Sequence, residues 1–331
     1  MNLIYLNDTS IEEHYGCDRV KVVLDKIFDD LGVTKTYRFV TGESSDRIIK
    51  EVSSKDCKVA IINGEGTFNY KNSYRFELYK VIKYLKTKGA KVFLLNASIY
   101  LDNSEINRIF NCFEKIYVRS ESDKNRLENL NIDSFVVPDL SFYYQSCSDD
   151  RRHAPKIPEK VFTDSVRLED SLRNLSLCRE SGSFWFSYLK TPSGPLGPLR
   201  LFRRLTRGQL KISNFLSCVI MAYCSFINYK KISDFDGFIA NVEYIRTGRF
   251  HCACMAIRNN IRFDFIPSNT AKIEDMLTDA RLIELYRREG SAYVLNDKSE
   301  LFFDRCNEYK AGANVSFGIM LSNLRDAVLE V

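Results

Sequence analysis

The order of strand-like and helix-like segments in the first half of the chain constrains the fold most. Short runs of β-branched and aliphatic residues alternate there with longer segments whose apolar residues recur every three or four positions. Parallel strands joined by helices require this alternation, so we expect an α/β fold with helices on both faces of a parallel sheet. The expected strands span residues 2–6, 58–63, 91–96, 115–118 and 134–137, and the expected helices span 20–31, 74–88, 105–113 and 121–130.

The length of 331 residues predicts two domains. A polar, proline-containing stretch at 145–158 is the expected linker between an N-terminal domain, 1–150, and a C-terminal domain, 151–331. A second α/β series follows it, and the pattern predicts two Rossmann-like doubly wound domains facing a cleft, with ligands at the C-terminal ends of the strands. The expected strands of this series are 160–163, 237–242 and 261–266, and the expected helices are 166–177, 248–259, 279–288, 298–310 and 316–329, the last packing near the domain junction.

The composition, 45% hydrophobic and 27% charged, is typical of a globular protein with a large core. The net charge of +5 is unevenly placed, because residues 181–233 contain no Asp or Glu but several Lys and Arg. A local basic surface of this kind favours one anionic partner and argues against a general nucleic-acid-binding protein.

A basic amphipathic helix is predicted within 195–212. Its positive residues fall on one face and suit an anionic membrane surface or a lipid-linked diphosphate. The alternative interpretation is a solvated charged face on an ordinary helix. The residues of this predicted basic helix are Arg200, Arg203, Arg204 and Arg207, with Lys211 one turn further on.

The ten cysteines include no Cys-x-x-Cys pair and no zinc-type spacing, so we expect no metal site and reduced thiols in the cytosol. The longest apolar run, 215–227, is shorter than the roughly 20 residues that a membrane-spanning helix needs. We therefore expect a cytoplasmic protein, with peripheral contact at the inner face of the cytoplasmic membrane.

The segment Thr247-Gly248-Arg249-Phe250-His251 is the strongest candidate for chemistry. A glycine turn into a helix start offers free backbone N–H groups to an anion, and Arg249 can clamp a phosphate or carboxylate through its planar fork. His251 can act as a general acid or base near neutral pH. Taken alone, Arg249 and His251 fit a structural pair equally well.

Together with other segments, these residues resemble the polysaccharide pyruvyl transferase family. Arg249-Phe250-His251, the run at 261–266, and Ser268-Asn269 followed by Lys272-Ile273 look like the C-terminal signature of that family. In the N-terminal half, three further segments resemble the glycine-rich turn, the Arg-plus-Ser element and the acidic turn of the family: Asn63-Gly64-Glu65-Gly66-Thr67, Tyr117-Val118-Arg119-Ser120 and Pro138-Asp139-Leu140-Ser141-Phe142.

The resemblance implies a fold like that of GT-B glycosyltransferases and transfer of a pyruvyl ketal from phosphoenolpyruvate to a sugar, in the synthesis of a surface polysaccharide, capsule or lipopolysaccharide. The acceptor would be a sugar or a lipid-linked glycan, bound by the N-terminal domain, with the donor on the C-terminal domain. No metal or other cofactor is required. The implied catalytic residues are His251, Asp139 and Glu65. The implied substrate-binding residues are Arg249, Phe250, Arg119, Ser120, Gly64, Gly66, Thr67, His14, Asn269 and Lys272.

Two departures from the family pattern leave an alternative open. The turn at 64–67 contains Glu65 instead of a run of glycines, and the N-terminal segment adds His14 to the same predicted cleft. An added carboxylate suits activation of an acceptor hydroxyl, so glycosyl transfer from a nucleotide sugar, such as a CMP-linked acidic keto sugar, is the second hypothesis. A non-catalytic binding module is the third. The structural alternatives are a helix N-terminal carboxylate for Glu65 and a satisfied core histidine for His14.

Overall fold

The computed structural model describes residues 2–12, 14–143, 159–186, 235–296 and 300–330, together with Thr206, Phe215, Leu216 and Val219. The expected linker at 145–158 and the four arginines of the predicted basic helix lie outside these residues. The chain divides into two compact units. Unit 1 comprises Met1–Glu12, Cys17–Tyr143 and Ala311–Val331, and unit 2 comprises Glu13–Gly16 and Tyr144–Lys310.

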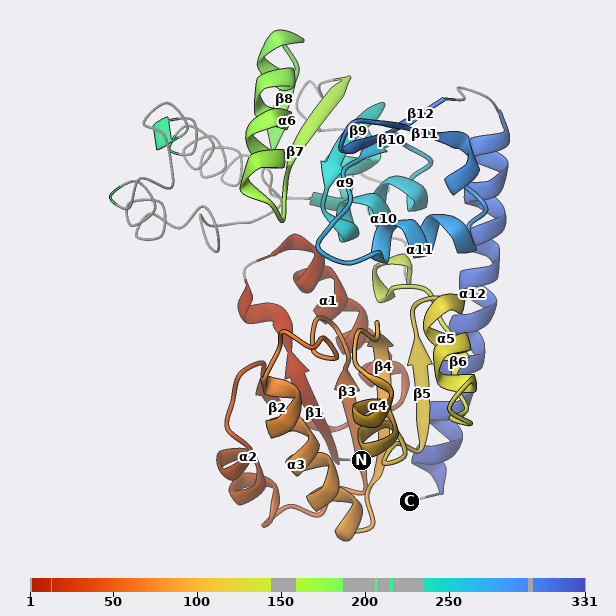
Figure 1. The fold of residues 1–331 in the computed structure, drawn as a ribbon. Coiled ribbons are helices and arrows are strands. Elements are labelled where there is room, and N and C mark those ends of the chain that lie inside the picture. The colour runs from red at the N-terminus through yellow and green to blue at the C-terminus, as the bar shows by residue number, and fades with distance from the viewer. Residues whose placement is uncertain are drawn as a thin grey trace. The chain divides into compact units, whose positions relative to one another are not determined.

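Unit 1 is built on a six-stranded sheet in the order β2-β1-β3-β4-β5-β6, with every strand parallel to its neighbour (Figure 1). The strands are β1 (Asn2–Asp8), β2 (Lys35–Val40), β3 (Val59–Asn63), β4 (Lys91–Ala97), β5 (Lys115–Val118) and β6 (Phe135–Val136). The helices are α1 (Tyr15–Asp30), α2 (Ser45–Val52), α3 (Tyr74–Thr87), α4 (Asn103–Phe110) and α5 (Glu121–Glu128), with short 3-10 turns at Thr9–Glu12 and Leu140–Phe142. The strand and helix segments expected in this half are confirmed, whereas β2 and α2 were not predicted.

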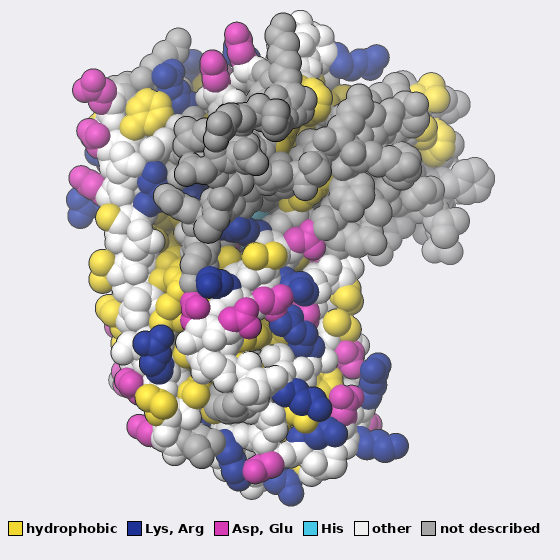
Figure 2. Space-filling view, turned by 180° about the vertical axis from the view of Figure 1, so that it is seen from behind, with side chains coloured by type: hydrophobic (Ala, Val, Ile, Leu, Met, Phe, Trp, Pro, Cys, Tyr) yellow, Lys and Arg dark blue, Asp and Glu magenta, His cyan; other side chains and the backbone are white. Residues whose placement is uncertain are grey.

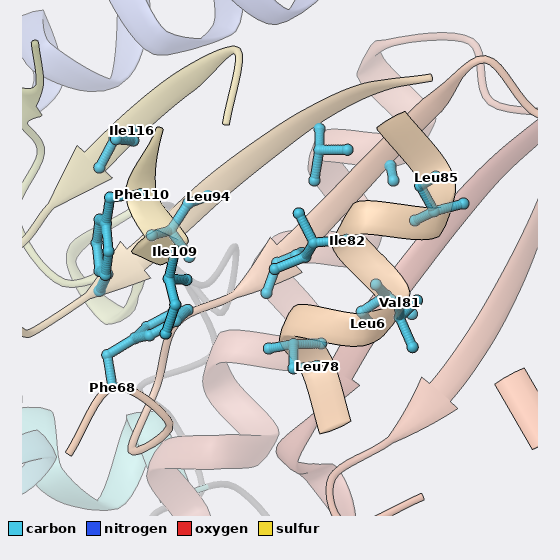
Figure 3. Packing of buried hydrophobic residues seen from close by; sticks show 14 of the residues in the cluster. Leu6, Phe68, Leu78, Val81, Ile82, Leu85, Leu94, Ile109, Phe110 and Ile116 are labelled. Atoms are coloured by element: carbon cyan, nitrogen blue, oxygen red, sulfur yellow. The ribbon is translucent and has the colours of Figure 1, made fainter. Parts of the chain in front are cut away.

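The helices of unit 1 cover both faces of its sheet. Side chains of consecutive strand residues point to opposite faces, and Tyr5 of β1 packs edge-on against Phe28 of α1, with 5.5 Å between the ring centroids. Its neighbour Leu6 belongs to the cluster on the other face, where Leu78 of α3 packs (Figure 3). A parallel sheet covered on both faces is what the alternation of strands and helices predicts.

The main core of unit 1 lies between α3, α4 and the sheet. The residues of α3 that enter it are spaced three and four apart, so that one stripe of the helix faces the strands. Phe68, which follows β3, packs edge-on against Phe110 of α4 with 5.0 Å between centroids. Figure 3 shows the α3 stripe of Leu78, Val81, Ile82 and Leu85 with Leu94 of β4 and Ile109 of α4 beside it.

Unit 2 contains a second six-stranded sheet, in the order β11-β12-β10-β9-β7-β8. The four strands β8, β7, β9 and β10 are parallel, and β12 and β11 continue the sheet as an antiparallel hairpin. The strands are β7 (Lys160–Ser165), β8 (Phe184–Phe186), β9 (Tyr244–Gly248), β10 (Arg262–Phe265), β11 (Tyr286–Glu289) and β12 (Ala292–Leu295). The helices are α6 (Leu168–Glu180), α9 (Phe235–Ala240), α10 (Phe250–Arg258), α11 (Lys272–Asp279) and α12 (Glu300–Leu329), with a 3-10 turn at Ile283–Leu285.

Three sequence predictions for the second half were wrong. The expected strand at 237–242 is largely helix α9. The strand is β9, which begins seven residues after the expected start and in which Tyr244-Ile245-Arg246 alternates between faces. The expected helix at 279–288 does not form. Arg281 has a φ of 55°, which is not helical, and β11 pairs with β12 through a turn at Gly290. The expected helices at 298–310 and 316–329 are one helix, α12, which continues through Gly312.

The C-terminal part of α12 belongs to unit 1, whereas the expected second domain ran to residue 331. Phe317 packs against Tyr143 with 4.6 Å between ring centroids, and Asn323 Oδ1 accepts a hydrogen bond from Lys115 Nζ at 3.0 Å. These contacts hold Ala311–Val331 against the first sheet. Unit 2 in turn takes in Glu13–Gly16 from the N-terminal sequence.

The surface of the described chain carries mixed charge. Figure 2 shows Lys and Arg side chains interspersed with Asp and Glu over one face. Within the described residues no helix is long and apolar enough to cross a membrane.

Candidate active site

The two sheets share the topological feature at which doubly wound folds bind ligands. In unit 1, β1 lies between β2 and β3, and in unit 2, β7 lies between β8 and β9. The order 2-1-3-4 places a switch point outside the C-terminal ends of β1 and β3, and of β7 and β9, because the connections leave these strands in opposite directions. The residues at these ends are Asn7, Asp8, Asn63, Gly64 and Glu65 in unit 1, and Asp164, Ser165, Gly248 and Arg249 in unit 2.

A chain of buried amides occupies the switch point of unit 1. Asn7 Nδ2 donates to the carbonyl oxygen of Asn63 at 2.5 Å and to Thr67 Oγ1 at 2.7 Å. Asn63 Nδ2 donates to Thr9 Oγ1 at 3.3 Å, and Asn96 Nδ2 donates to Asn63 Oδ1 at 3.3 Å. Asn7 and Asn96 have φ values of 62° and 60°, a left-handed conformation that asparagine tolerates better than most residues. Residues held in such conformations cluster at functional sites.

Gly64 allows two neighbouring strand ends to approach closely. A Cβ at this position would lie 2.5 Å from Ala97 Cβ and 2.7 Å from Ala97 Cα, which is too close for any side chain. The Gly64 N–H also donates to the carbonyl oxygen of Leu95 at 2.7 Å. Gly66, two residues later, has a φ of 68°, which glycine adopts without strain. The backbone conformation of this turn therefore requires glycine at both positions.

Glu65 presents a half-buried carboxylate beside this turn. Its Oε2 accepts a hydrogen bond from Thr9 Oγ1 at 3.0 Å, and its Oε1 lies 3.7 Å from Cys17 Sγ. Burial, with the nearby carboxylates of Glu65 and Glu12, raises the pKa of the Cys17 thiol well above its ordinary value. Cys17 therefore keeps its proton and donates it toward Glu65. These contacts are with side chains, and α3 begins only at Tyr74, so the interpretation of Glu65 as a helix N-terminal carboxylate is wrong.

Arg119 and Asp139 form a buried ion pair. Arg119 Nε lies 3.0 Å from Asp139 Oδ2, with side chains that are 4% and 1% exposed. Asn96 Oδ1 accepts hydrogen bonds from the same Nε at 3.0 Å and from the Leu140 N–H at 3.2 Å. Arg119, an expected substrate-binding residue, and Asp139, an expected catalytic residue, are thus bound to each other. Asn96 links them to the chain of buried amides.

Two other expected substrate-binding residues of unit 1 have structural hydrogen bonds. Ser120 is the N-cap of α5, where its Oγ accepts from the Asp123 N–H at 3.1 Å. Thr67 accepts from Asn7 and donates to the carbonyl oxygen of Glu65 at 3.2 Å. Both side chains are buried. Their hydrogen bonds fix the strand ends on which Glu65 and Arg119 lie.

In unit 2, Arg249 is held by a carboxylate that sequence reasoning missed. Arg249 Nε donates to Asp164 Oδ2 at 2.8 Å, and Nη2 donates to the same oxygen. The Asp164 side chain is fully buried, and that of Arg249 is 12% exposed. The approach depends on Gly248, because a Cβ there would lie 2.5 Å from Ser165 Cβ and 2.9 Å from Ser165 Cα.

The backbone around Arg249 is fixed as well. The Arg249 N–H donates to Thr247 Oγ1 at 3.0 Å, and that hydroxyl accepts from Thr163 Oγ1 at 2.7 Å. Cys252, in the first turn of α10, is fully buried, and burial raises the pKa of its thiol to about 12. Cys252 is therefore a packing residue near the site and remains a thiol.

His251 and His14 lie together in unit 2, although 237 positions separate them in the sequence. Their ring centroids are 5.6 Å apart, at an interplanar angle of 62°. The Gly16 N–H donates to His14 Nδ1 at 3.1 Å, so this ring nitrogen carries no proton in this arrangement. Gly16 packs directly against the His251 ring, and Phe250 contacts the same ring with 5.4 Å between centroids. His251 is 6% exposed.

The remaining expected residues lie further along unit 2. Asn269 is exposed, and its Oδ1 accepts a hydrogen bond from Ser268 Oγ at 3.1 Å. Lys272 is half-buried at the first position of α11. Within the part of the chain that the structure describes, no cluster of three or more His, Cys, Asp or Glu residues could hold a metal ion.

Sequence reasoning missed Asp164, Asn96 and Gly16. Asp164 carries a recognisable signal, since it is a carboxylate at the end of the strand at 160–163, which the pattern had identified. Asn96 carries the same signal, since it ends the expected strand at 91–96. Gly16 carries no such signal, because its importance arises from contact with a residue distant in the sequence.

The chain is similar to one protein family and to several solved structures. The family model described as polysaccharide pyruvyl transferase matches residues 14–268. A comparison with curated proteins gave no match. Among solved structures, a functionally uncharacterised protein from Klebsiella pneumoniae subsp. pneumoniae NTUH-K2044 is 12% identical, with a TM-score of 0.45 over 84% of this chain and 87% of that chain. A UDP-N-acetylglucosamine 2-epimerase from Rickettsia bellii is 9% identical, with a TM-score of 0.45 over 100% of both chains.

Proposed function

Since the chain belongs to the polysaccharide pyruvyl transferase family, we propose that it transfers the pyruvyl group of phosphoenolpyruvate to two hydroxyls of a sugar during synthesis of a surface polysaccharide or lipopolysaccharide. Unit 2 is proposed to bind the donor and unit 1 the acceptor. The observation that carries the proposal is the start of α10, where Arg249 and His251 are held two residues apart by separate sets of contacts.

Arg249 and His251 suit the chemistry of this donor. Phosphoenolpyruvate carries a carboxylate and a phosphate, and a planar guanidinium binds either group through two parallel hydrogen bonds. The backbone N–H groups at the beginning of α10 add a favourable dipole for the same anion. The carbon of its CH₂ group must gain a proton before the neighbouring carbon becomes electrophilic, and an imidazole is the side chain best suited to deliver it near neutral pH.

The proposed reaction balances without a further reactant. His251 delivers a proton to the CH₂ carbon, and the positive charge that develops on the neighbouring carbon is attacked by the first sugar hydroxyl. The bond from that carbon to the phosphate oxygen then breaks, inorganic phosphate leaves, and the second hydroxyl closes the ketal. Of the two hydroxyl protons, one replaces the proton that His251 gave, and the other is removed by a carboxylate base and passed to the departing phosphate.

Glu65 is the proposed base for the acceptor hydroxyl. Its carboxylate is half-buried and held by Thr9, whereas Asp139 is 1% exposed and paired with Arg119. A general base must come within hydrogen-bonding reach of the proton that it removes. We therefore assign to Glu65 the removal of the proton from the acceptor hydroxyl. Asp139 and Arg119 are assigned the role of fixing the strand ends around Glu65.

The acceptor is proposed to be a sugar or lipid-linked glycan that is reached at the inner face of the cytoplasmic membrane. The support is the acid-free segment 181–233 with its basic residues. A polyanionic lipid surface or diphosphate would attract this segment through charge.

Ligand-dependent melting of the purified protein tests the donor. A ligand that binds only the native state raises the melting temperature, so phosphoenolpyruvate should stabilise the protein and CMP, UDP and GDP should not. Stabilisation by CMP alone would instead favour the glycosyl-transfer alternative, and stabilisation by none of the four would contradict both.

Two variants test the assigned residues through phosphate release in the presence of an acceptor glycan. His251→Ala should lower kcat by about 10²–10⁴ while leaving the melting temperature near that of the native protein. Arg249→Lys keeps the charge but removes the fork, so the KM for phosphoenolpyruvate should rise by roughly 10- to 100-fold. Arg262→Lys, in β10 of the same unit, is the matched control and should leave both constants unchanged. Native turnover in His251→Ala would show that His251 is structural.

A further inference from the structure

Arg249 uses only part of its guanidinium within the protein. Both of its hydrogen bonds to Asp164 come from the side-on edge, formed by Nε and Nη2. Among the described residues, no hydrogen bond or ion pair of Arg249 involves Nη1. A guanidinium has five N–H donors in a fixed fork, so the end-on edge formed by Nη1 and the second N–H of Nη2 remains for a ligand. The side chain is 12% exposed.

We infer that Asp164 is a positioning residue of the donor site, which fixes the side-on edge of Arg249 so that its end-on edge meets the carboxylate or phosphate of phosphoenolpyruvate. This inference rests on the proposed function. It deepens that function by assigning a role to a residue that never contacts the substrate.

The surroundings of Asp164 support a fixed orientation. Asp164 is fully buried at the end of β7, and Gly248 brings the end of β9 within contact of Ser165 beside it. The Thr163 and Thr247 hydroxyls bond each other at 2.7 Å across the same two strands. These contacts restrict movement of both strand ends, and with them movement of the Asp164 carboxylate. Arg249 therefore has one orientation before the donor arrives, which reduces the entropy lost on binding.

The charge of the pair also favours this role. A buried arginine without a counter-ion would be costly to desolvate, and a carboxylate on one edge offsets that cost. The Asp164 carboxylate occupies only the side-on edge, formed by Nε and Nη2. An aspartate at the end-on edge would compete with the donor anion, whereas an aspartate at the side-on edge does not.

Kinetics of Asp164→Asn test the inference. Asn keeps the shape of the side chain but removes the charge that orients the fork, so the KM for phosphoenolpyruvate should rise by roughly 10- to 100-fold while kcat changes by less than about threefold. Asp170→Asn, a nearly buried carboxylate in the first turn of α6, is the matched control and should behave as the native enzyme. A general loss of packing would lower kcat and the melting temperature without this selective effect on KM.

A double-mutant cycle tests whether Asp164 acts through Arg249. If it does, Asp164→Asn should add little to the donor KM in an Arg249→Lys background, because the fork that it orients is already absent. Additive effects, or a native donor KM in Asp164→Asn, would overturn the inference.

NMR of the native protein provides a test that does not depend on the folding of a variant. In ¹⁵N-arginine-labelled protein, with Arg249 assigned by comparison with Arg249→Lys, phosphoenolpyruvate should shift the Nη resonances and leave the Nε resonance in place. An Nε shift as large as the Nη shifts would refute the inference that the donor binds the end-on edge while Asp164 holds the side-on edge. Inorganic phosphate is titrated in parallel. Binding of phosphate without phosphoenolpyruvate would refute the proposed donor alone, and binding of neither would refute both the donor and the inference.

Discussion

Substitution of Gly16 by alanine should disable His251, although Gly16 itself takes no part in the proposed chemistry. Gly16 lies near the start of α1, and its Cα packs against the His251 ring. A Cβ at this position would lie 2.6 Å from His251 Cβ, and nearer still to Cγ and Nδ1 of the ring. Rotation of the ring about χ1 moves Cγ and Nδ1 but leaves Cβ in place. The overlap is therefore relieved only when the backbone of α1 or α10 shifts.

The expected cost follows from the size of this shift. Overpacking of a buried site lowers the free energy of unfolding by about 1–3 kcal/mol, which a domain of this size tolerates. Catalysis is more sensitive, because a misplacement of about 1 Å can lower a rate by roughly 10²-fold. We expect kcat to fall about 100-fold. The KM for phosphoenolpyruvate should stay within a few-fold of native, because Arg249 is held by Asp164 and not by Gly16.

The assay is steady-state phosphate release, with the melting temperature recorded for the same preparation. Gly312→Ala is the control, because Gly312 lies in α12 and a Cβ there would meet no atom within 4 Å. It should leave kcat unchanged and slightly stabilise the helix. A folded Gly16→Ala protein with native kcat would show that the packing of Gly16 on His251 does not set the position of the imidazole.

Three further outcomes are expected. Asp139→Asn removes the counter-charge of the buried Arg119 and should lower the free energy of unfolding by about 3–5 kcal/mol in urea denaturation; a loss below about 1 kcal/mol would contradict a buried pair. Lys80 and Ser45 lower the pKa of Glu77 from its ordinary 4.5 to about 2, so its carboxylate stabilises the fold above pH 4.5 and this stabilisation is lost as the pH falls to 2. Glu77→Gln should therefore lower stability by about 1 kcal/mol at pH 7, a figure reduced for solvent screening because the side chain is 35% exposed, and denaturation curves of variant and native protein should converge at pH 2. Replacing the four arginines of the predicted basic helix by serine should weaken co-sedimentation with anionic liposomes, at about 1 kcal/mol per residue; unchanged sedimentation would favour the solvated-face interpretation.

The fold could be predicted from the sequence wherever strands are buried on both faces. The strand at 58–63 is a continuous apolar run because α-helices cover both sides of it in the sheet. β2 was missed because it is an edge strand with only Phe39 buried, so its sequence shows neither a continuous run nor a clear alternation. The expected helix at 279–288 took in most of β11, since the charged residues at 287–289 face solvent and mimic a helical polar face.

The site could be predicted only in part. Arg249 and His251 follow from a local signal, a glycine turn at the junction of a strand and a helix. The contacts that fix them come from Asp164 and from His14 and Gly16, which lie on distant segments. A local pattern cannot reveal which carboxylate a given arginine meets, since that depends on the order of strands in the sheet. The strand order became available only with the structure.

Buried arginine–carboxylate pairs are a costly way to stabilise a fold. The desolvation of both charges cancels most of their attraction, so that well-packed apolar residues of similar volume stabilise a protein equally well or better. This chain nevertheless buries Arg119 with Asp139 in unit 1 and Arg249 with Asp164 in unit 2, each beside a candidate site. Stability alone does not account for their presence, whereas the proposed orientation of Arg249 toward the donor anion accounts for the pair in unit 2.

This reasoning leads to a double replacement in unit 2. Asp164→Leu alone leaves Arg249 buried without a counter-charge and should lower the free energy of unfolding by about 3–5 kcal/mol. Combined with Arg249→Met, the same change removes both charges, and the free energy of unfolding should return to the native value or exceed it by about 1–4 kcal/mol. The double variant should still fail to bind phosphoenolpyruvate in a melting-temperature titration. If instead the double variant were as unstable as the single one, the pair would be needed for the fold, and its place beside the donor site would carry no functional meaning.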